Sequence, residues 1–121
     1  MFDEDVINLY SNGDCHLLSY YINIYNKHTK IYLLRHDGVI IHSLVYYNNK
    51  FHDITGGYDD PRKIYDYWSK CYPEYEGKAK LLFSLSLIND IKDLSLDEYS
   101  IAEHIAAERF VKTNINKLLG I

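Results

Sequence analysis

Three segments rich in β-branched and aromatic residues follow one another in the centre of this chain, with a turn signal between each pair. The segments are residues 30–35, 39–47 and 50–55. Asp37-Gly38 separates the first two, and Asn48-Asn49 separates the second from the third. Both pairs tolerate the positive φ that two-residue hairpin turns require. The segments therefore predict a small antiparallel sheet, which Gly56-Gly57 is expected to end.

Helices are predicted on either side of this sheet. Asp14 is a good N-cap residue, and apolar residues at spacings of three and four follow it, so a helix is predicted to begin at Cys15. After the sheet, Asp60 and Pro61 have the residue types of an N-cap and a first helical position. Tyr72-Pro73 is expected to end that second helix.

The last third of the chain predicts a strand and then a long helix. Residues 79–88 alternate with a period close to two, which favours a strand. Residues 97–119 have helical spacing, with acidic residues early, lysines late and Gly120 as a stop. We therefore expect an α+β fold: an N-terminal helix that carries the cysteine, packed on a small antiparallel sheet, and a long C-terminal helix.

Composition limits the class of protein. The 121 residues are 47% hydrophobic, which suits a single compact domain over residues 1–121. The net charge of −4 and the scattered Lys and Arg argue against a nucleic-acid partner. No apolar run approaches the roughly 20 residues that span a bilayer, and the acidic N-terminus is unlike a secretory signal. We expect a cytoplasmic protein with no membrane association, in which Cys15 and Cys71 are reduced.

Cys15 is the candidate nucleophile. In the first turn of a helix, unpaired N–H groups and the helix dipole favour a thiolate and can donate to an oxyanion. Asp14 precedes it as the predicted N-cap residue. The alternative is that Cys15 is a small buried hydrophobic residue, as free cysteines often are.

The second hairpin supplies a candidate base and its partner. If Asn48-Asn49 is the loop, Leu44 lies opposite Asp53, so His42 and Asp53 become diagonal neighbours on one face, with Cα atoms roughly 7 Å apart. A four-residue loop keeps this arrangement, whereas a three-residue loop puts the two residues on opposite faces. Pairing would satisfy both side chains in an apolar strand, and it would leave one imidazole nitrogen for a thiol. The alternative is a structural His-Asp pair with no thiol nearby.

The order of these elements resembles the papain-like cysteine peptidase superfamily, in its compact NlpC/P60-like and transglutaminase-like branches. The resemblance is carried by three motifs and extends to about Gly57: Gly13-Asp14-Cys15-His16-Leu17-Leu18, His42-Ser43-Leu44-Val45 and Phe51-His52-Asp53-Ile54-Thr55-Gly56. It implies that Cys15 attacks an acyl carbon, that His42 is the general base and that Asp53 orients His42. In that superfamily a polar side chain just before the cysteine often assists the oxyanion hole, and Asn12 is the nearest match here. His16 stands where many members have a bulky aromatic residue.

Two functions follow from these residues. The first is a small cysteine-dependent acyl-transfer enzyme, a peptidase, amidase or deamidase that acts on a peptide or protein through a thioester and needs no cofactor. The second is a binding or inhibitor module of phage or mobile-element type on the same scaffold, which could use its thirteen tyrosines as a contact surface.

The remaining histidines and cysteine support neither a metal site nor a second base. Cys15, His16, His42 and Cys71 lack the spacing of a metal site, so no metal is expected. His28, His36 and His104 are expected on the surface, and His52 is expected on the opposite face from Asp53. Substrate, partner and oligomeric state do not follow from the sequence.

Overall fold

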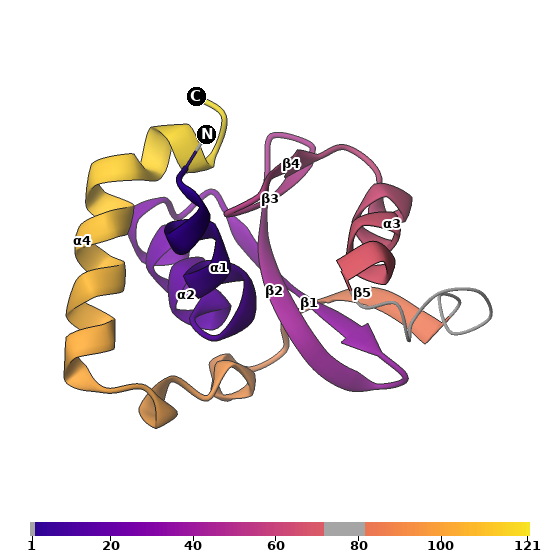
Figure 1. The fold of residues 1–121 in the computed structure, drawn as a ribbon, viewed down its shortest axis with the longest axis horizontal. Helices are drawn as coiled ribbons and strands as arrows, with labels where there is room; N and C mark the ends of the chain where they lie inside the picture. Colours follow the sequence, from indigo (N-terminus) through magenta and orange to yellow (C-terminus); the bar gives the residue numbers. More distant parts are fainter. Residues whose placement is uncertain (1, 72–81) are drawn as a thin grey trace.

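A computed structural model describes residues 2–71 and 82–121 and confirms the expected α+β fold (Figure 1). The helices are α1 (Glu4–Asn12), α2 (Cys15–Tyr25), α3 (Pro61–Cys71) and α4 (Ile101–Leu118), with short 3-10 helices η3 (Ile91–Leu94) and η4 (Leu96–Glu98). The strands are β1 (Lys30–His36), β2 (Val39–Tyr47), β3 (Lys50–Asp53), β4 (Gly56–Tyr58) and β5 (Phe83–Leu87). Among the described residues, no helix is both long and apolar enough to cross a membrane.

The strands form one antiparallel sheet in the order β4-β3-β2-β1-β5. Both predicted hairpin turns are confirmed, because Asp37, Gly38, Asn48 and Asn49 all have positive φ. Tyr47 pairs with Lys50, which is the register predicted for the second hairpin.

The sheet continues past the point where the sequence predicted its end. β3 stops at Asp53, and Gly56 then begins β4, so the expectation that Gly56-Gly57 closes the sheet was wrong. The Asp53 carboxylate accepts a hydrogen bond from the Thr55 N–H at 2.8 Å, and Gly56 has a φ of 137°. Such an Asx turn followed by a positive φ reverses the chain, so that Gly56 pairs back with Asp53.

Helices cover both faces of the sheet. Figure 1 shows α1, α2 and α4 on one side of β2 and α3 on the other. The larger core joins α1, α2 and α4 to buried strand residues such as Leu33 and Val45. The smaller core joins Leu34 and Leu44 to Ile64 and Trp68 of α3. Neighbouring residues of β1 and β2 therefore alternate between two cores, as strand geometry requires.

Several helix boundaries differ from the sequence predictions. The helix α1 was not predicted, although Asp3 caps it by accepting from the Val6 N–H. The C-terminal helix begins at Ile101 and not at residue 97, because Ser100 and Glu103 form a capping box there. The predicted start at Pro61 and the strand at Phe83–Leu87 are confirmed. Residues 79–81 and the expected stop at Tyr72-Pro73 lie outside the described residues.

Candidate active site

Cys15 is the first residue of α2, and its side chain is almost enclosed, with 4% of the residue exposed. Asp14 occupies the N-cap position as predicted, but its carboxylate makes no capping hydrogen bond. The Cys15 Sγ lies 3.6 Å from Nδ1 of His16, the next residue in the same turn. The thiol therefore lies at the helix start with an imidazole directly beside it.

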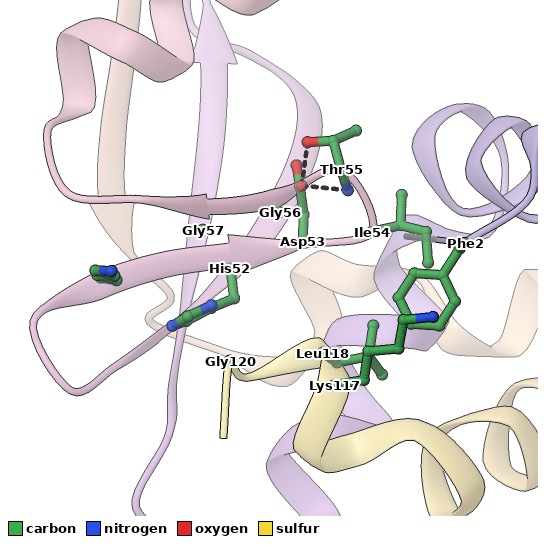
Figure 2. Close-up of a pocket in the computed structure, with 11 residues that line it drawn as sticks. Phe2, His52, Asp53, Ile54, Thr55, Gly56, Gly57, Lys117, Leu118 and Gly120 are labelled. Atoms are coloured by element: carbon green, nitrogen blue, oxygen red, sulfur yellow. Dashed lines mark hydrogen bonds between the residues drawn. The ribbon is translucent and has the colours of Figure 1, made fainter.

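His42 and Asp53 form the side-chain pair that the hairpin register predicted. His42 Nε2 lies 2.8 Å from Asp53 Oδ2, and both residues are buried. The other carboxylate oxygen, Oδ1, accepts from the Thr55 N–H at 2.8 Å and from the Thr55 hydroxyl at 2.5 Å (Figure 2). Because both oxygens are occupied, Asp53 is fixed in place and in turn fixes the orientation of the imidazole.

The thiol of Cys15 interacts with His42 as well as with His16. Burial alone would raise the pKa of the thiol, but the neighbouring imidazoles of His16 and His42 lower that pKa to about 5. Burial would lower the pKa of His42, but Asp53 and Cys15 raise it to about 9. At neutral pH this pair favours a thiolate and an imidazolium, which is the activated form of a cysteine nucleophile.

The two nitrogens of His42 have separate roles in this arrangement. Nε2 is bound to Asp53, and Nδ1 makes no hydrogen bond of ordinary geometry with any described residue. Nδ1 is therefore the nitrogen that remains for exchange of a proton with Cys15. The ring also packs against the indole of Trp68, with ring centroids 4.4 Å apart. Trp68 packs against the ring at an interplanar angle of 41°, while Asp53 holds Nε2.

A buried hydroxyl ties the cysteine turn to the strand that carries His42. Ser43 Oγ donates to the Cys15 carbonyl at 3.2 Å and lies 2.9 Å from both His16 Nδ1 and Ser19 Oγ. Ser43 points to the α2 side of β2, since successive strand residues alternate in direction. This network sets the position of the first turn of α2 relative to β2, and so of Cys15 relative to His42.

The two residues before the cysteine lie close to it but make other contacts. Asn12 is exposed, and its Nδ2 donates to the Asn8 carbonyl at 3.0 Å, within α1. Asp14 is buried. Burial, a hydrogen bond with Glu103, and the charges of Glu103 and Cys15 raise the Asp14 pKa to about 6. Asp14 therefore contributes a negative charge beside the thiol above that pH, and its carboxylate does not cap α2.

Of the other histidines, His28 is exposed as predicted, whereas His104 is half-buried. Nδ1 of His104 lies 2.8 Å from the Tyr21 hydroxyl, and Nε2 lies 2.8 Å from the Leu96 carbonyl oxygen. His36 is half-buried and packs against Phe83. The rings of His36 and His104 pack between secondary-structure elements and lie outside the cysteine site.

His52 is buried and points away from Asp53, packing over Gly57. Four residues that support the site were not predicted from the sequence: His16, Ser43, Thr55 and Trp68. Only Thr55 carried a local signal, because a residue two positions after an aspartate is the usual donor of an Asx turn.

Two cavities lie near this arrangement. One, of about 310 Å³, is lined by Asp53 and Thr55 together with the C-terminal end of α4 at Lys117 and Gly120 (Figure 2). The other, of about 270 Å³, lies between α1 and α3, and Trp68 forms part of its wall. Among the described residues, the two cavities border Asp53 and Trp68, and neither Cys15 nor His42 lines either of them.

Within residues 2–71 and 82–121, no three metal-ligating side chains gather as a metal site would require. Cys15 and Cys71 are both present as thiols. No family model, curated protein or solved structure matches this chain.

Proposed function

We propose that the protein is a small cysteine-dependent acyl-transfer enzyme that acts on a carboxamide or peptide bond. One observation carries the proposal: Cys15 begins α2, and the buried His42, whose Nε2 is bound to Asp53, contributes with His16 to lowering the pKa of the Cys15 thiol. A nucleophile, a base and a residue that orients the base are the minimum set for covalent acyl transfer by a thiol. The order of these residues along the chain also matches the papain-like resemblance.

The chemistry follows from the ionisation of this pair. The Cys15 thiolate attacks the carbonyl carbon, a C–S bond forms and the carbonyl electrons move onto oxygen. Free N–H groups in the first turn of α2 are the proposed donors to that oxyanion. When the C–N bond breaks, His42 gives its proton to the leaving amine, and a thioester remains on Cys15. Water then attacks the thioester while His42 accepts a proton, and the thiolate leaves.

Asp53 supports both halves of this cycle. Its carboxylate stabilises the imidazolium before the amine leaves, and it keeps Nδ1 directed at the thiol when the ring is neutral. The reaction needs a reduced thiol and no cofactor. A reducing compartment such as the cytoplasm suits it.

p-Nitrophenyl acetate tests the proposal without knowledge of the natural substrate. We expect a burst of about one equivalent of p-nitrophenolate, with acetylation of Cys15 found by peptide mass mapping. Cys71→Ser should retain the burst and Cys15→Ser should lose it. Acetylation confined to Cys71, or no acetylated cysteine at all, would contradict the proposal.

A second function is favoured by one observation, the 4% exposure of Cys15. A thiol so enclosed could simply belong to the core of a module that binds a partner protein. In that case the ester would leave Cys15 unmodified, and the biological effect would survive removal of the thiol.

A further inference from the structure

One nitrogen of His16 contacts both the sulfur of Cys15 and a buried hydroxyl. His16 Nδ1 lies 3.6 Å from Cys15 Sγ and 2.9 Å from Ser43 Oγ. Ser43 Oγ in turn lies 3.2 Å from the Cys15 carbonyl oxygen and 2.9 Å from Ser19 Oγ. Because Ser43 and Ser19 are buried, their hydroxyls depend on these neighbours for hydrogen bonds. The positions of the protons in this cluster therefore follow from the contacts themselves.

The Ser43 hydroxyl has one proton to donate and two lone pairs that accept. The carbonyl oxygen of Cys15 can only accept, so the proton of Ser43 is directed to it. The contacts of Ser43 with Ser19 and His16 are then hydrogen bonds only if both of those partners donate. All three contacts are satisfied together when Nδ1 of His16 carries a proton. Every other assignment leaves at least one of these contacts without a proton, which costs stability.

A protonated Nδ1 determines what His16 can do for the thiol. The N–H can donate to the sulfur 3.6 Å away, but Nδ1 cannot take the proton of the thiol. Nδ1 of His42 is the nitrogen left for that proton, because it is buried and has no hydrogen-bond partner of ordinary geometry among the described residues. A donor beside the sulfur agrees with the lowered pKa of the Cys15 thiol, to which His16 contributes. The two histidines therefore have different roles.

We infer that His16 is a positioning residue of the Cys15 site: Ser43 keeps its ring in the Nδ1–H form, and this N–H donates to the thiolate while His42 exchanges the proton. The inference rests on the proposed acyl-transfer function and adds a second histidine that is not the base. A hydrogen bond to an ionised sulfur is stronger than one to a neutral sulfur. His16 therefore stabilises Cys15 before the attack and again when the thiolate leaves the thioester.

Nitrogen-15 NMR of the histidine rings measures the tautomer without any reaction. Neutral imidazole in water prefers the Nε2–H form, so an Nδ1–H form is a specific expectation for His16. The signals that disappear in His16→Asn identify the ring. At a pH where this ring is neutral, we expect a protonated Nδ1 in the wild type and a shift towards the Nε2–H form in Ser43→Ala. An unprotonated Nδ1 in the wild type would overturn the inference.

A matched pair of variants tests whether the N–H of His16 acts on the thiol. Asparagine can place an N–H at the position of Nδ1, whereas leucine has a similar branched shape and no donor. We expect His16→Leu to raise the pH of the Cys15 alkylation transition by about one pH unit, and His16→Asn to raise it less. His28→Asn is the control, because His28 is exposed and lies beyond the other end of α2. Equal shifts in His16→Asn and His16→Leu, or no shift in either, would contradict the role of the N–H.

Acetylation by p-nitrophenyl acetate connects His16 to the proposed reaction. The p-nitrophenolate leaves without a proton, so acetylation depends on the thiolate, whereas hydrolysis of the thioester needs a base. His16→Leu should slow acetylation about fivefold at pH 5 and little at pH 8, where the thiolate forms in either protein. His42→Gln should slow hydrolysis of the acetyl-enzyme at both pH values.

The outcomes separate this inference from the proposed function. If Cys15 is acetylated but His16→Leu slows the reaction equally at pH 5 and pH 8, His16 does not act on the ionisation of the thiol. The inference then fails and the proposed function stands. If Cys15 is not acetylated at all, the proposed function fails, while the NMR and alkylation measurements still decide whether His16 donates to the sulfur.

Discussion

His42 Nε2 and Asp53 Oδ2 are 2.8 Å apart, and their side chains are only 1% and 2% exposed. Two ionisable groups so deeply buried are tolerated because each satisfies the other. Removal of either partner leaves the remaining one buried without its hydrogen bond. The pair therefore affects both folding and the state of the Cys15 thiol, and the two effects can be measured separately.

Asp53→Ala should destabilise the fold and reduce the reactivity of Cys15. The unpaired imidazole should cost about 1–3 kcal/mol in the free energy of unfolding, which urea titration measures. Asp53→Asn is the matched control, because the amide keeps the shape and a hydrogen bond but removes the charge. We expect it to retain more stability than Asp53→Ala while still slowing alkylation of Cys15. A fully stable and fully reactive Asp53→Ala protein would show that the pair supports neither role.

Iodoacetamide should alkylate Cys15 faster than Cys71 near neutral pH, although Cys71 is the more exposed thiol. The imidazoles of His16 and His42 lower the Cys15 pKa to about 5 despite burial, so the alkylation rate of Cys15 should rise as the pH passes about 5 and then stay level. The urea-unfolded protein is the control, and its thiols should titrate near about 8.5. Restricted access to Cys15 lowers the absolute rate, while the pH of the transition reports the pKa of the thiol.

His42→Gln should move the alkylation transition of Cys15 to higher pH, because the imidazolium that stabilises the thiolate is gone. At pH 6 the rate should fall at least about tenfold. The same transition in His42→Gln and wild type would mean that His42 does not set the ionisation of the thiol.

The local parts of this arrangement could be predicted from the sequence. The turns at Asp37-Gly38 and Asn48-Asn49 depend on adjacent residues, and the two-residue period of a strand then fixes that His42 and Asp53 share a face. The His42–Asp53 pair could therefore be predicted from the Asn48-Asn49 turn alone. The β4 strand was not predicted, because a Gly-Gly pair is typical of the end of a sheet. Only the turn made by Asp53 and Thr55 shows that Gly56 begins another strand.

The supporting residues could not be predicted in this way. Ser43 reaches His16 across 27 positions of sequence, and this contact exists only because α2 packs on one face of β2. Trp68 reaches His42 from α3 on the opposite face. Such contacts depend on how separate elements pack, which neither periodicity nor turn chemistry specifies.

Asp14→Asn should stabilise the protein at pH 8 and have little effect at pH 4. Burial, Glu103 and Cys15 raise the Asp14 pKa from 3.8 to about 6, so the folded state holds a proton that the unfolded chain releases. The contribution of Asp14 to the free energy of unfolding is therefore fully present below about pH 3.8. It is lost as the pH rises through about 6. Asparagine mimics the protonated form and should gain on the order of 1 kcal/mol at pH 8.

Glu103→Gln is the matched control for Asp14, since glutamine can keep the capping box while it removes the neighbouring charge. In the wild-type background, Glu103→Gln should reduce the difference between the free energies of unfolding at pH 4 and pH 8. In the Asp14→Asn background, Glu103→Gln should change this pH dependence of stability less. Additive effects of the two changes would show that the carboxyl groups do not interact.

Ser43→Ala should loosen the start of α2 from β2. The hydroxyl donates to the Cys15 carbonyl and contacts His16 and Ser19, so its loss leaves buried polar groups without a partner, at a cost of about 1–3 kcal/mol in unfolding free energy. The Cys15 alkylation rate should also fall, because the thiol is no longer held against His42. Ser19→Ala is the control: it removes one bond of the network but none to Cys15 or His16, so it should cost less and leave the rate nearly unchanged.

Cys15→Ala distinguishes the two functions. Alanine in the first turn of a helix removes one sulfur atom and leaves the buried His42–Asp53 pair in place, so the protein should still unfold cooperatively. If the protein is an enzyme, the rate should fall at least about 10³-fold, because among the described residues Cys15 is the thiol that contacts a histidine. A binding module would keep its effect in Cys15→Ala and lose it when exposed aromatic residues are truncated. Cys71→Ala is the control and should retain the effect in either case. A folded Cys15→Ala protein with undiminished effect would therefore exclude catalysis by this thiol and leave the arrangement as a scaffold for binding.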